Sequence, residues 1–237
     1  MKRAQILLSV DGAKHLIARA LIKKLDFSKR IYIAYGSTNE YVLYHLGIEL
    51  DRLYCAGCNV NSALNVTRFR DKPIVLEDGK VIDISEFRMD KNSVLIKGAN
   101  ALWYEGDDKC AAVFAADEKG GTYGNFYVKA ACLGSEIIIP VGHEKLIPHF
   151  EPVSQNVDFA TGEKIATLRF FKGEVFTEIE AFETLFNLKA RIIGSGGIFE
   201  NQGSTIFLVE GEKAYEAVTF ANEYNGKKIL KKGGFIH

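Results

Sequence analysis

The sequence has no excess of charge of either sign: lysine plus arginine and aspartate plus glutamate each number 30, so the formal net charge is zero. Neutralising the backbone of a nucleic acid normally needs a clustered excess of cations. No segment approaches about 18 consecutive apolar residues, the length at which a membrane-spanning helix is predicted. We therefore expect neither a nucleic acid nor a membrane as a partner.

The chain also lacks a recognisable secretion signal. Its first residues are basic and then apolar, but Asp11, Lys14 and His15 interrupt the apolar run before a signal core is complete. The expected location is cytoplasmic.

Cysteine is scarce, and four cysteines in 237 residues do not form a disulfide scaffold. Cys55 and Cys58 stand in a C-x-x-C spacing, whereas Cys110 and Cys132 are isolated. A structural zinc site would normally offer a second close pair, and a redox pair is expected between a strand and a helix rather than before a turn. We expect ordinary buried or loop cysteines, with no metal site and no cofactor.

Length and composition point to a folded protein of more than one domain. At about 150 residues per domain, 237 residues exceed a single domain. Hydrophobic residues make up 47% and charged residues 25%, which are ordinary proportions for a globular protein and exclude disorder as the dominant state.

Strands alternate with helices in the first 150 residues. An amphipathic helix from about Asp11 precedes a strand at 31–35, and a second helix follows. Later strands are predicted at 93–97, 110–116 and 136–139, with a helix reaching Leu133 before the last of them. Continuous apolar strands suit a parallel sheet covered on both faces. This pattern predicts an α/β domain (1–150) with a mostly parallel, Rossmann-like sheet and helices on both faces.

The pattern changes near Pro148 and Pro152. Beyond them the order is β-α-β-β-α-β, which predicts a smaller ferredoxin-like α+β domain over residues 151–237. The expected strands are 166–171, 190–193, 205–209 and 228–230, and the expected helices are 178–186 and 212–224.

Three glycine turns carry the functional signal. The first glycine loop, Gly36-Ser37-Thr38-Asn39, lies between a strand and a helix, where main-chain N–H groups and the helix dipole favour an anion. Its three polar side chains can donate hydrogen bonds to a phosphate or a carboxylate. Alternatively, Ser37 or Thr38 only caps the helix. The loop lacks the lysine and spacing of a P-loop and the G-x-G-x-x-G of a dinucleotide-binding turn.

The second glycine loop, Lys97-Gly98-Ala99-Asn100, ends another strand, where open α/β sheets bind ligands. Its alternative reading is a strand-ending turn with Asn100 in a left-handed conformation.

The third glycine loop, residues 118–124, precedes a helix. Lys119 could offer a point charge to an anion, and Asp117 and Glu118 could act as acids or bases. All three could equally be solvated loop residues. Since the carboxyl ends of parallel strands meet at one rim of a sheet, we expect the three glycine loops to converge there.

His143 and Lys145 directly follow the strand at 136–139. His143 could carry a proton in catalysis or be a surface loop residue. Lys145 joins the ligand-binding candidates.

These motifs occur in the order found in a known group of proteins. Together with the stretch 137–146 and the later stretch 197–207, the glycine loops resemble the ribose-5-phosphate isomerase and sugar-sensing repressor branch of a superfamily that also holds glucosamine-6-phosphate deaminase and CoA transferases. The resemblance spans most of the chain, although each motif is short. It implies that Gly36, Ser37, Thr38 and Lys119 hold a sugar phosphate.

This chain does not retain the catalytic acids of the isomerase family that it resembles. The isomerase pattern G-A-D-E-V-D supplies two acidic residues where this chain has Asn100 and Trp103, and the position of the proton-transfer glutamate falls near Tyr127. Isomerisation needs a base that moves a proton between two adjacent carbons. Without that glutamate we do not expect isomerase activity itself.

The expected function is binding of a small phosphorylated or carboxylated metabolite, with an isomerase-like reaction of altered chemistry if the protein is an enzyme. The alternative is a non-catalytic metabolite sensor or an oligomeric scaffold, and exposed edge strands predict a homodimer or a larger homo-oligomer. The catalytic candidates are Lys119, Asp117 and Glu118. The ligand-binding candidates are Gly36, Ser37, Thr38, Asn39, Lys97, Gly98, Asn100 (orienting the substrate), Gly120, Gly121, Thr122 and Lys145.

Overall fold

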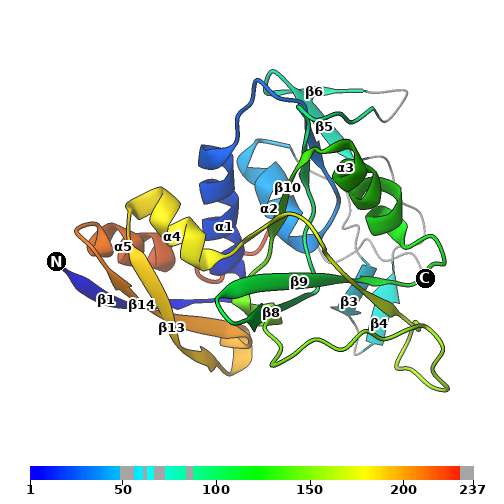
Figure 1. Cartoon of the computed structure of the whole chain (residues 1–237). Helices are drawn as coiled ribbons and strands as arrows, with labels where there is room; N and C mark the ends of the chain where they lie inside the picture. The colour runs from blue at the N-terminus through cyan, green and yellow to red at the C-terminus, as the bar shows by residue number, and fades with distance from the viewer. Residues whose placement is uncertain (49–55, 61–62, 67–72, 84–87, 230–237) are drawn as a thin grey trace.

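The computed structural model describes residues 1–48, 56–60, 63–66, 73–83 and 88–229. Within these ranges the expected mixed α/β fold is confirmed: a central six-stranded sheet is accompanied by five α-helices and smaller antiparallel sheets (Figure 1). Cys55 lies outside the described residues, so the expectation for the C-x-x-C pair stays a prediction.

The central sheet has the strand order β12-β10-β7-β2-β5-β6. Strands β12, β10, β7 and β2 run parallel, whereas β5 and β6 extend the sheet in antiparallel fashion. A two-residue turn joins β5 to β6, and both its residues, Asp78 and Gly79, have positive φ, which favours a hairpin. The bounds are β2 Ile31–Ile33, β5 Ile74–Glu77, β6 Lys80–Ile82, β7 Val94–Ile96, β10 Glu136–Pro140 and β12 Glu174–Phe176.

Alternating side chains of the central strands supply two separate cores. On one face, Ile31 and Ile33 pack in a core with helices α1 (Val10–Lys24), α2 (Ser37–His45) and α4 (Glu178–Phe186). On the other face, Tyr32 packs in a core with the π-helical turn η1 (Tyr123–Tyr127) and helix α3 (Val128–Leu133). This alternation follows from the two-residue period of a strand. Helices therefore lie on both faces of the sheet (Figure 1).

Helix α1 begins one residue before the predicted start. Ser9 is its N-cap, and the Ser9 side chain accepts a hydrogen bond from the N–H of Gly12 at 3.1 Å. Asp11 in the first turn and the two lysines of the last turn both match the helix dipole.

The ferredoxin-like order predicted for residues 151–237 is wrong. Strand β11 (Ala166–Arg169) pairs with β9, and β12 joins the central sheet beside β10. Of the expected last strand, Lys228 and Ile229 are in no strand and residue 230 lies outside the described residues. A short apolar strand indicates burial but not which sheet it joins, and this ambiguity accounts for the error.

The remaining strands of that half pair with the start of the chain. Strand β1 (Arg3–Leu8) lies antiparallel to β14 (Ser204–Glu210), and β14 also pairs with β13 (Lys189–Gly196). Helix α5 (Ala214–Tyr224) shares the core of this sheet with α1 and α4. One sheet thus joins both ends of the described chain, and the domain boundary near residue 150 stays a prediction.

A third sheet covers the α3 side of the central sheet. Its order is β11-β9-β8, with β8 at Ala101–Glu105 and β9 at Asp108–Ala115. The predicted strand at 110–116 is therefore found, but in this antiparallel sheet. The smaller elements are β3 (Ala56–Val60), β4 (Ala63–Val66), and the 3-10 turns η2 (His143–Lys145) and η3 (Phe199–Asn201). Among the described residues, none of the helices is both long and apolar enough to cross a membrane.

Candidate functional site

The three glycine loops meet at a cavity of about 60 Å³, close to the carboxyl ends of β2 and β7. The parallel course of these strands places their loops at one rim of the sheet, as the sequence predicts. The cavity is lined by Tyr35, Gly36, Ser37, Thr38, Lys97, Gly98, Ala99, Asn100, Val113, Phe114, Ala115, Asp117, Gly120, Gly121, Thr122, Tyr123 and Lys145.

The first glycine loop forms the start of α2. The N-cap of this helix is Gly36, and no side chain caps it. Neither Ser37 nor Thr38 therefore acts as the N-cap residue. The first N–H groups of a helix have no intrahelical partner and attract an anion. Thr38 lines the cavity and is 2% exposed, and its hydroxyl has no hydrogen-bond partner among the described residues.

Asn39 has a different place from its neighbours. It is fully buried and does not line the cavity. Its side-chain amide donates hydrogen bonds to the carbonyls of Ala34 (2.6 Å) and Ile96 (3.2 Å). Asn39 therefore ties α2 to the ends of β2 and β7, which positions the first glycine loop.

The second glycine loop connects the central sheet to the third sheet. Asn100 accepts a hydrogen bond from the N–H of Phe114 at 3.0 Å through its side chain, and its own N–H donates to Ala112. Lys97, which is 7% exposed, lines the cavity near these two hydrogen bonds of Asn100.

The third glycine loop turns through two left-handed glycines. Gly120 and Gly121 have φ of 72° and 55°, a region that a residue with a side chain rarely adopts. The carboxylate of Asp117 accepts a hydrogen bond from the N–H of Gly121 at 2.9 Å and so stabilises the turn. A π-helical turn follows at Tyr123, and such turns are frequent at functional sites.

Only one of the three catalytic candidates lines the cavity. Asp117 does, whereas Glu118 and Lys119 are exposed and are not among the lining residues. The turn at the glycines directs Gly120, Gly121 and Thr122 into the cavity instead.

Lys145 reaches the cavity from η2. Its Nζ donates a hydrogen bond to the carbonyl of Ala99 in the second glycine loop at 2.7 Å. Burial lowers the pKa of the Lys145 amine, and the charge of Lys14 lowers it further, while Glu144 and Glu178 act in the opposite direction.

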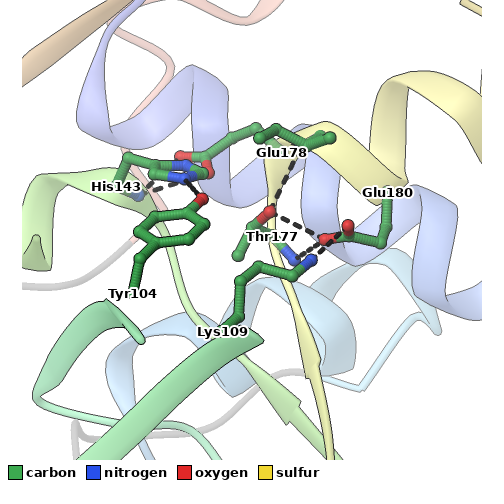
Figure 2. A network of polar contacts seen from close by, with 7 residues as sticks. Tyr104, Lys109, His143, Thr177, Glu178 and Glu180 are labelled. Atoms are coloured by element: carbon green, nitrogen blue, oxygen red, sulfur yellow. Dashed lines mark hydrogen bonds and ion pairs between the residues drawn. The ribbon is translucent and has the colours of Figure 1, made fainter. Parts of the chain in front are cut away.

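His143, two residues earlier, belongs to a separate polar network (Figure 2). The labelled residues of this network are Tyr104, Lys109, His143, Thr177, Glu178 and Glu180. His143 is 5% exposed, which excludes the surface-loop reading. Glu178, fully buried at the start of α4, lies 2.5 Å from Nδ1 of His143 and also accepts the main-chain N–H of His143 at 3.0 Å. Tyr104 contacts Nε2 of His143 at 2.8 Å.

The same network continues into the cap of α4. Thr177 is the N-cap of α4 and forms a capping box with Glu180. Its side chain accepts the N–H of Ile179 at 3.3 Å, and its own N–H donates to the carboxylate of Glu180 at 2.9 Å. The Thr177 hydroxyl also donates to that carboxylate at 2.7 Å. Lys109 forms an ion pair with Glu180. Tyr104 lies close to both glutamates, and burial together with their charges raises the pKa of its phenol to about 12. Tyr104 is therefore a neutral hydrogen-bonding group at physiological pH.

Sequence reasoning missed part of the site. Tyr35 and Tyr123 line the cavity next to predicted residues, and adjacency to a glycine loop is the only signal that could have found them. Glu178 carries no local signal, because its partner His143 is 35 positions away.

Comparisons with known proteins found no relative of this chain. No protein-family model, curated protein or solved structure matches the chain. Within the described ranges, no group of three or more histidine, cysteine, aspartate or glutamate side chains is placed to hold a metal ion.

Proposed function

We propose that the cavity binds the phosphate or carboxylate group of a small metabolite. The observation that carries this proposal is the Thr38 hydroxyl, which is buried, unpartnered and part of the cavity lining. Buried polar groups are nearly always hydrogen-bonded, and a buried one without a partner costs about 1–3 kcal/mol. A bound anion would accept a hydrogen bond from this hydroxyl.

The surroundings of Thr38 favour an anion over a neutral ligand. The uncapped start of α2 presents main-chain N–H groups and a positive dipole end. Lys97 and Lys145 line the same cavity, and two amines there supply the donors that a phosphate or carboxylate requires.

We also propose that the parallel part of the central sheet is the Rossmann-like sheet of the isomerase and sugar-sensing repressor superfamily. The support is the order of the motifs along the chain, together with the position of the first two glycine loops after β2 and β7. A substrate of that class, a sugar phosphate, would place its phosphate at the first glycine loop.

The test measures thermal unfolding of the full chain with inorganic phosphate, sugar phosphates and small carboxylates. A ligand that binds the folded state raises Tm with its concentration. Thr38→Val should reduce the affinity for the best anion about tenfold, since a hydrogen bond to a charged group contributes about 1.5 kcal/mol.

Thr219→Val is the matched control, because Thr219 is exposed on α5 and is not part of the cavity lining. It should bind the anion like the unmodified protein. The proposal is wrong if no anion raises Tm, or if Thr38→Val and Thr219→Val bind the same anion equally well.

A further inference from the structure

The amine of Lys145 has fewer partners than its charged form requires. A lysine ammonium has three N–H donors. Within the described part of the chain, Nζ of Lys145 makes one hydrogen bond, to the neutral carbonyl of Ala99, and forms no ion pair. A buried ammonium without a paired anion is costly, so this site favours the neutral amine.

Nearby charges act on the amine from several elements. Lys14 of α1 opposes protonation of Lys145, and Lys97 lines the same cavity. Glu144 of η2 and Glu178 of α4 favour the charged form, but burial is the largest influence and the pKa of Lys145 is lowered. A lysine that is desolvated near another cation is the usual arrangement of an amine nucleophile.

The network of Figure 2 holds this amine in position. Glu178 accepts the N–H of His143 and contacts its imidazole, which fixes the start of η2, the turn that carries Lys145. Two residues after the turn, the N–H of Ile147 donates to the carbonyl of Leu102 in β8 at 2.8 Å. The Lys145 side chain therefore extends from a turn anchored on both sides.

We propose that Lys145 is an amine nucleophile that forms a Schiff base with the carbonyl group of an anionic aldehyde or ketone held in the cavity. The inference rests on the proposed function, because the first glycine loop would hold the anionic group while the carbonyl carbon meets Nζ. One cavity offers a partner to both groups of such a ligand, because Thr38, next to the anionic group, and Lys145, next to the carbonyl carbon, both line it.

The step balances without a cofactor. The neutral amine attacks the carbonyl carbon, and a proton moves from nitrogen to the carbonyl oxygen to give a carbinolamine. Loss of that oxygen as water forms the C=N bond. The resulting imine takes a proton and withdraws electrons from the neighbouring carbon, which activates carbon acids for proton removal or C–C cleavage.

The test traps the imine by reduction. The full chain is incubated with pyruvate or with dihydroxyacetone phosphate, with and without sodium borohydride, and the intact mass and the modified peptide are measured. Hydride addition makes the link permanent, so the modified protein is heavier by the mass of the probe less one oxygen atom. We expect modification at Lys145 at least about tenfold faster than at exposed lysines, because the cavity holds the anionic probe beside Nζ, whereas exposed lysines meet it only by collision.

Two variants serve as the comparison. Lys145→Arg keeps N–H donors at this position but cannot form an imine, and it should lose the rapid modification. Lys213→Arg removes an exposed lysine next to α5 and should leave the modification unchanged. Because peptide mapping of the unmodified protein locates the adduct directly, the result stands even if Lys145→Arg fails to fold.

The outcomes separate this inference from the proposed function. Phosphate that raises Tm but no rapid adduct at Lys145 with either probe overturns the nucleophile and leaves the anion site, with Lys145 as its counter-ion. An adduct spread evenly over surface lysines also overturns the nucleophile. An adduct at Lys145 that inorganic phosphate slows supports both, whereas an adduct that phosphate leaves unchanged, with no anion raising Tm, supports the nucleophile and contradicts the anion site.

Discussion

His143 and Lys145 are two residues apart in one short turn, yet their surroundings are opposite. The imidazole of His143 contacts Glu178 through Nδ1 and Tyr104 through Nε2, so both ring nitrogens are partnered. The amine of Lys145 has a single carbonyl partner and faces the cavity. Because burial of a polar group is costly unless it is partnered, the first arrangement supports the fold and the second prepares a binding site.

The same contrast separates two threonines at helix starts. Thr177 caps α4 with a hydroxyl bonded to Glu180, whereas Thr38 at the start of α2 has an unpartnered hydroxyl. Four experiments, from the largest expected effect to the smallest, test how much the partners and the burial of a polar group matter. Two concern the network and the cavity, and two concern a histidine pair and an ion pair elsewhere in the fold.

Loss of the buried carboxylate should have the largest effect. Glu178→Ala leaves the imidazole and the main-chain N–H of His143 without their acceptor, so we expect the free energy of unfolding to fall by about 3–5 kcal/mol. Urea denaturation measures the change. Glu183→Ala, an exposed position on the same helix, should stay within about 0.5 kcal/mol. Equal losses in the two variants would show that the network does not hold the fold.

The contacting pair of His15, which is fully buried, and His45, which is partly buried, should make stability depend on pH. Nδ1 of His15 lies 2.8 Å from Nε2 of His45, and burial, aided by the charges of His15, Arg19 and Lys227, lowers the pKa of His45 to about 4. Below about pH 6.5 the unfolded chain therefore binds a proton at His45, whereas the folded chain binds this proton only below about pH 4. Between these values stability falls with falling pH, by about 3 kcal/mol in total.

Urea denaturation at several pH values checks this expectation against His45→Gln. The variant should lose most of the extra slope between pH 6.5 and 4, because the group with the lowered pKa is gone. Parallel stability curves for the two proteins would contradict the assignment to His45.

The two threonines should respond to the same substitution with opposite signs. Thr177→Val removes a partnered cap and should lower the free energy of unfolding by about 1–2 kcal/mol. Thr38→Val removes an unpartnered buried hydroxyl and should raise it by about 1 kcal/mol in the absence of ligand. Thermal and urea unfolding without added anions measure both. A loss of stability in Thr38→Val would mean that its hydroxyl already has a partner in solution.

Loss of an exposed ion pair should change the stability of the fold least. Arg169 donates to both carboxylate oxygens of Glu105 at 2.7 Å, but both side chains are about half exposed (44% and 50%). Since water and salt screen such pairs, Glu105→Gln should leave the urea midpoint unchanged within error. A clear loss would show that the distinction between buried and exposed polar partners is too simple here.

The glycine loops show how far local sequence reaches. Ser37 and Gly98 lie together in the cavity, as the rule that parallel strands end at one rim of a sheet predicts. Gly121 lines the same cavity, although its loop follows β9 of the antiparallel third sheet. Lys119 was predicted with them, yet it is exposed, because the left-handed glycines that follow it turn the chain. The direction of one side chain in a loop depends on backbone angles that a residue pattern does not specify.

The sequence did not predict which distant strands pair with one another. Strand β1 pairs with β14 about two hundred residues later, and β11, within the strand predicted at 166–171, pairs with β9 instead of joining a sheet of residues 151–237. Short apolar strands are interchangeable in their local pattern, and their partners depend on which faces the helices leave open.

The sequence by itself determined the mixed α/β class, the helices α1, α2 and α4, and the glycine turns, because period and turn chemistry are local properties. Only the tertiary structure decided which polar groups have partners. The difference between His143 and Lys145 arises from Glu178 and Ala99, which lie 35 and 46 positions away along the chain. Hydrogen bonds between such distant residues form only once packing brings them together, so the sequence predicts most of the lining residues, and only the fold shows which of their polar groups have partners.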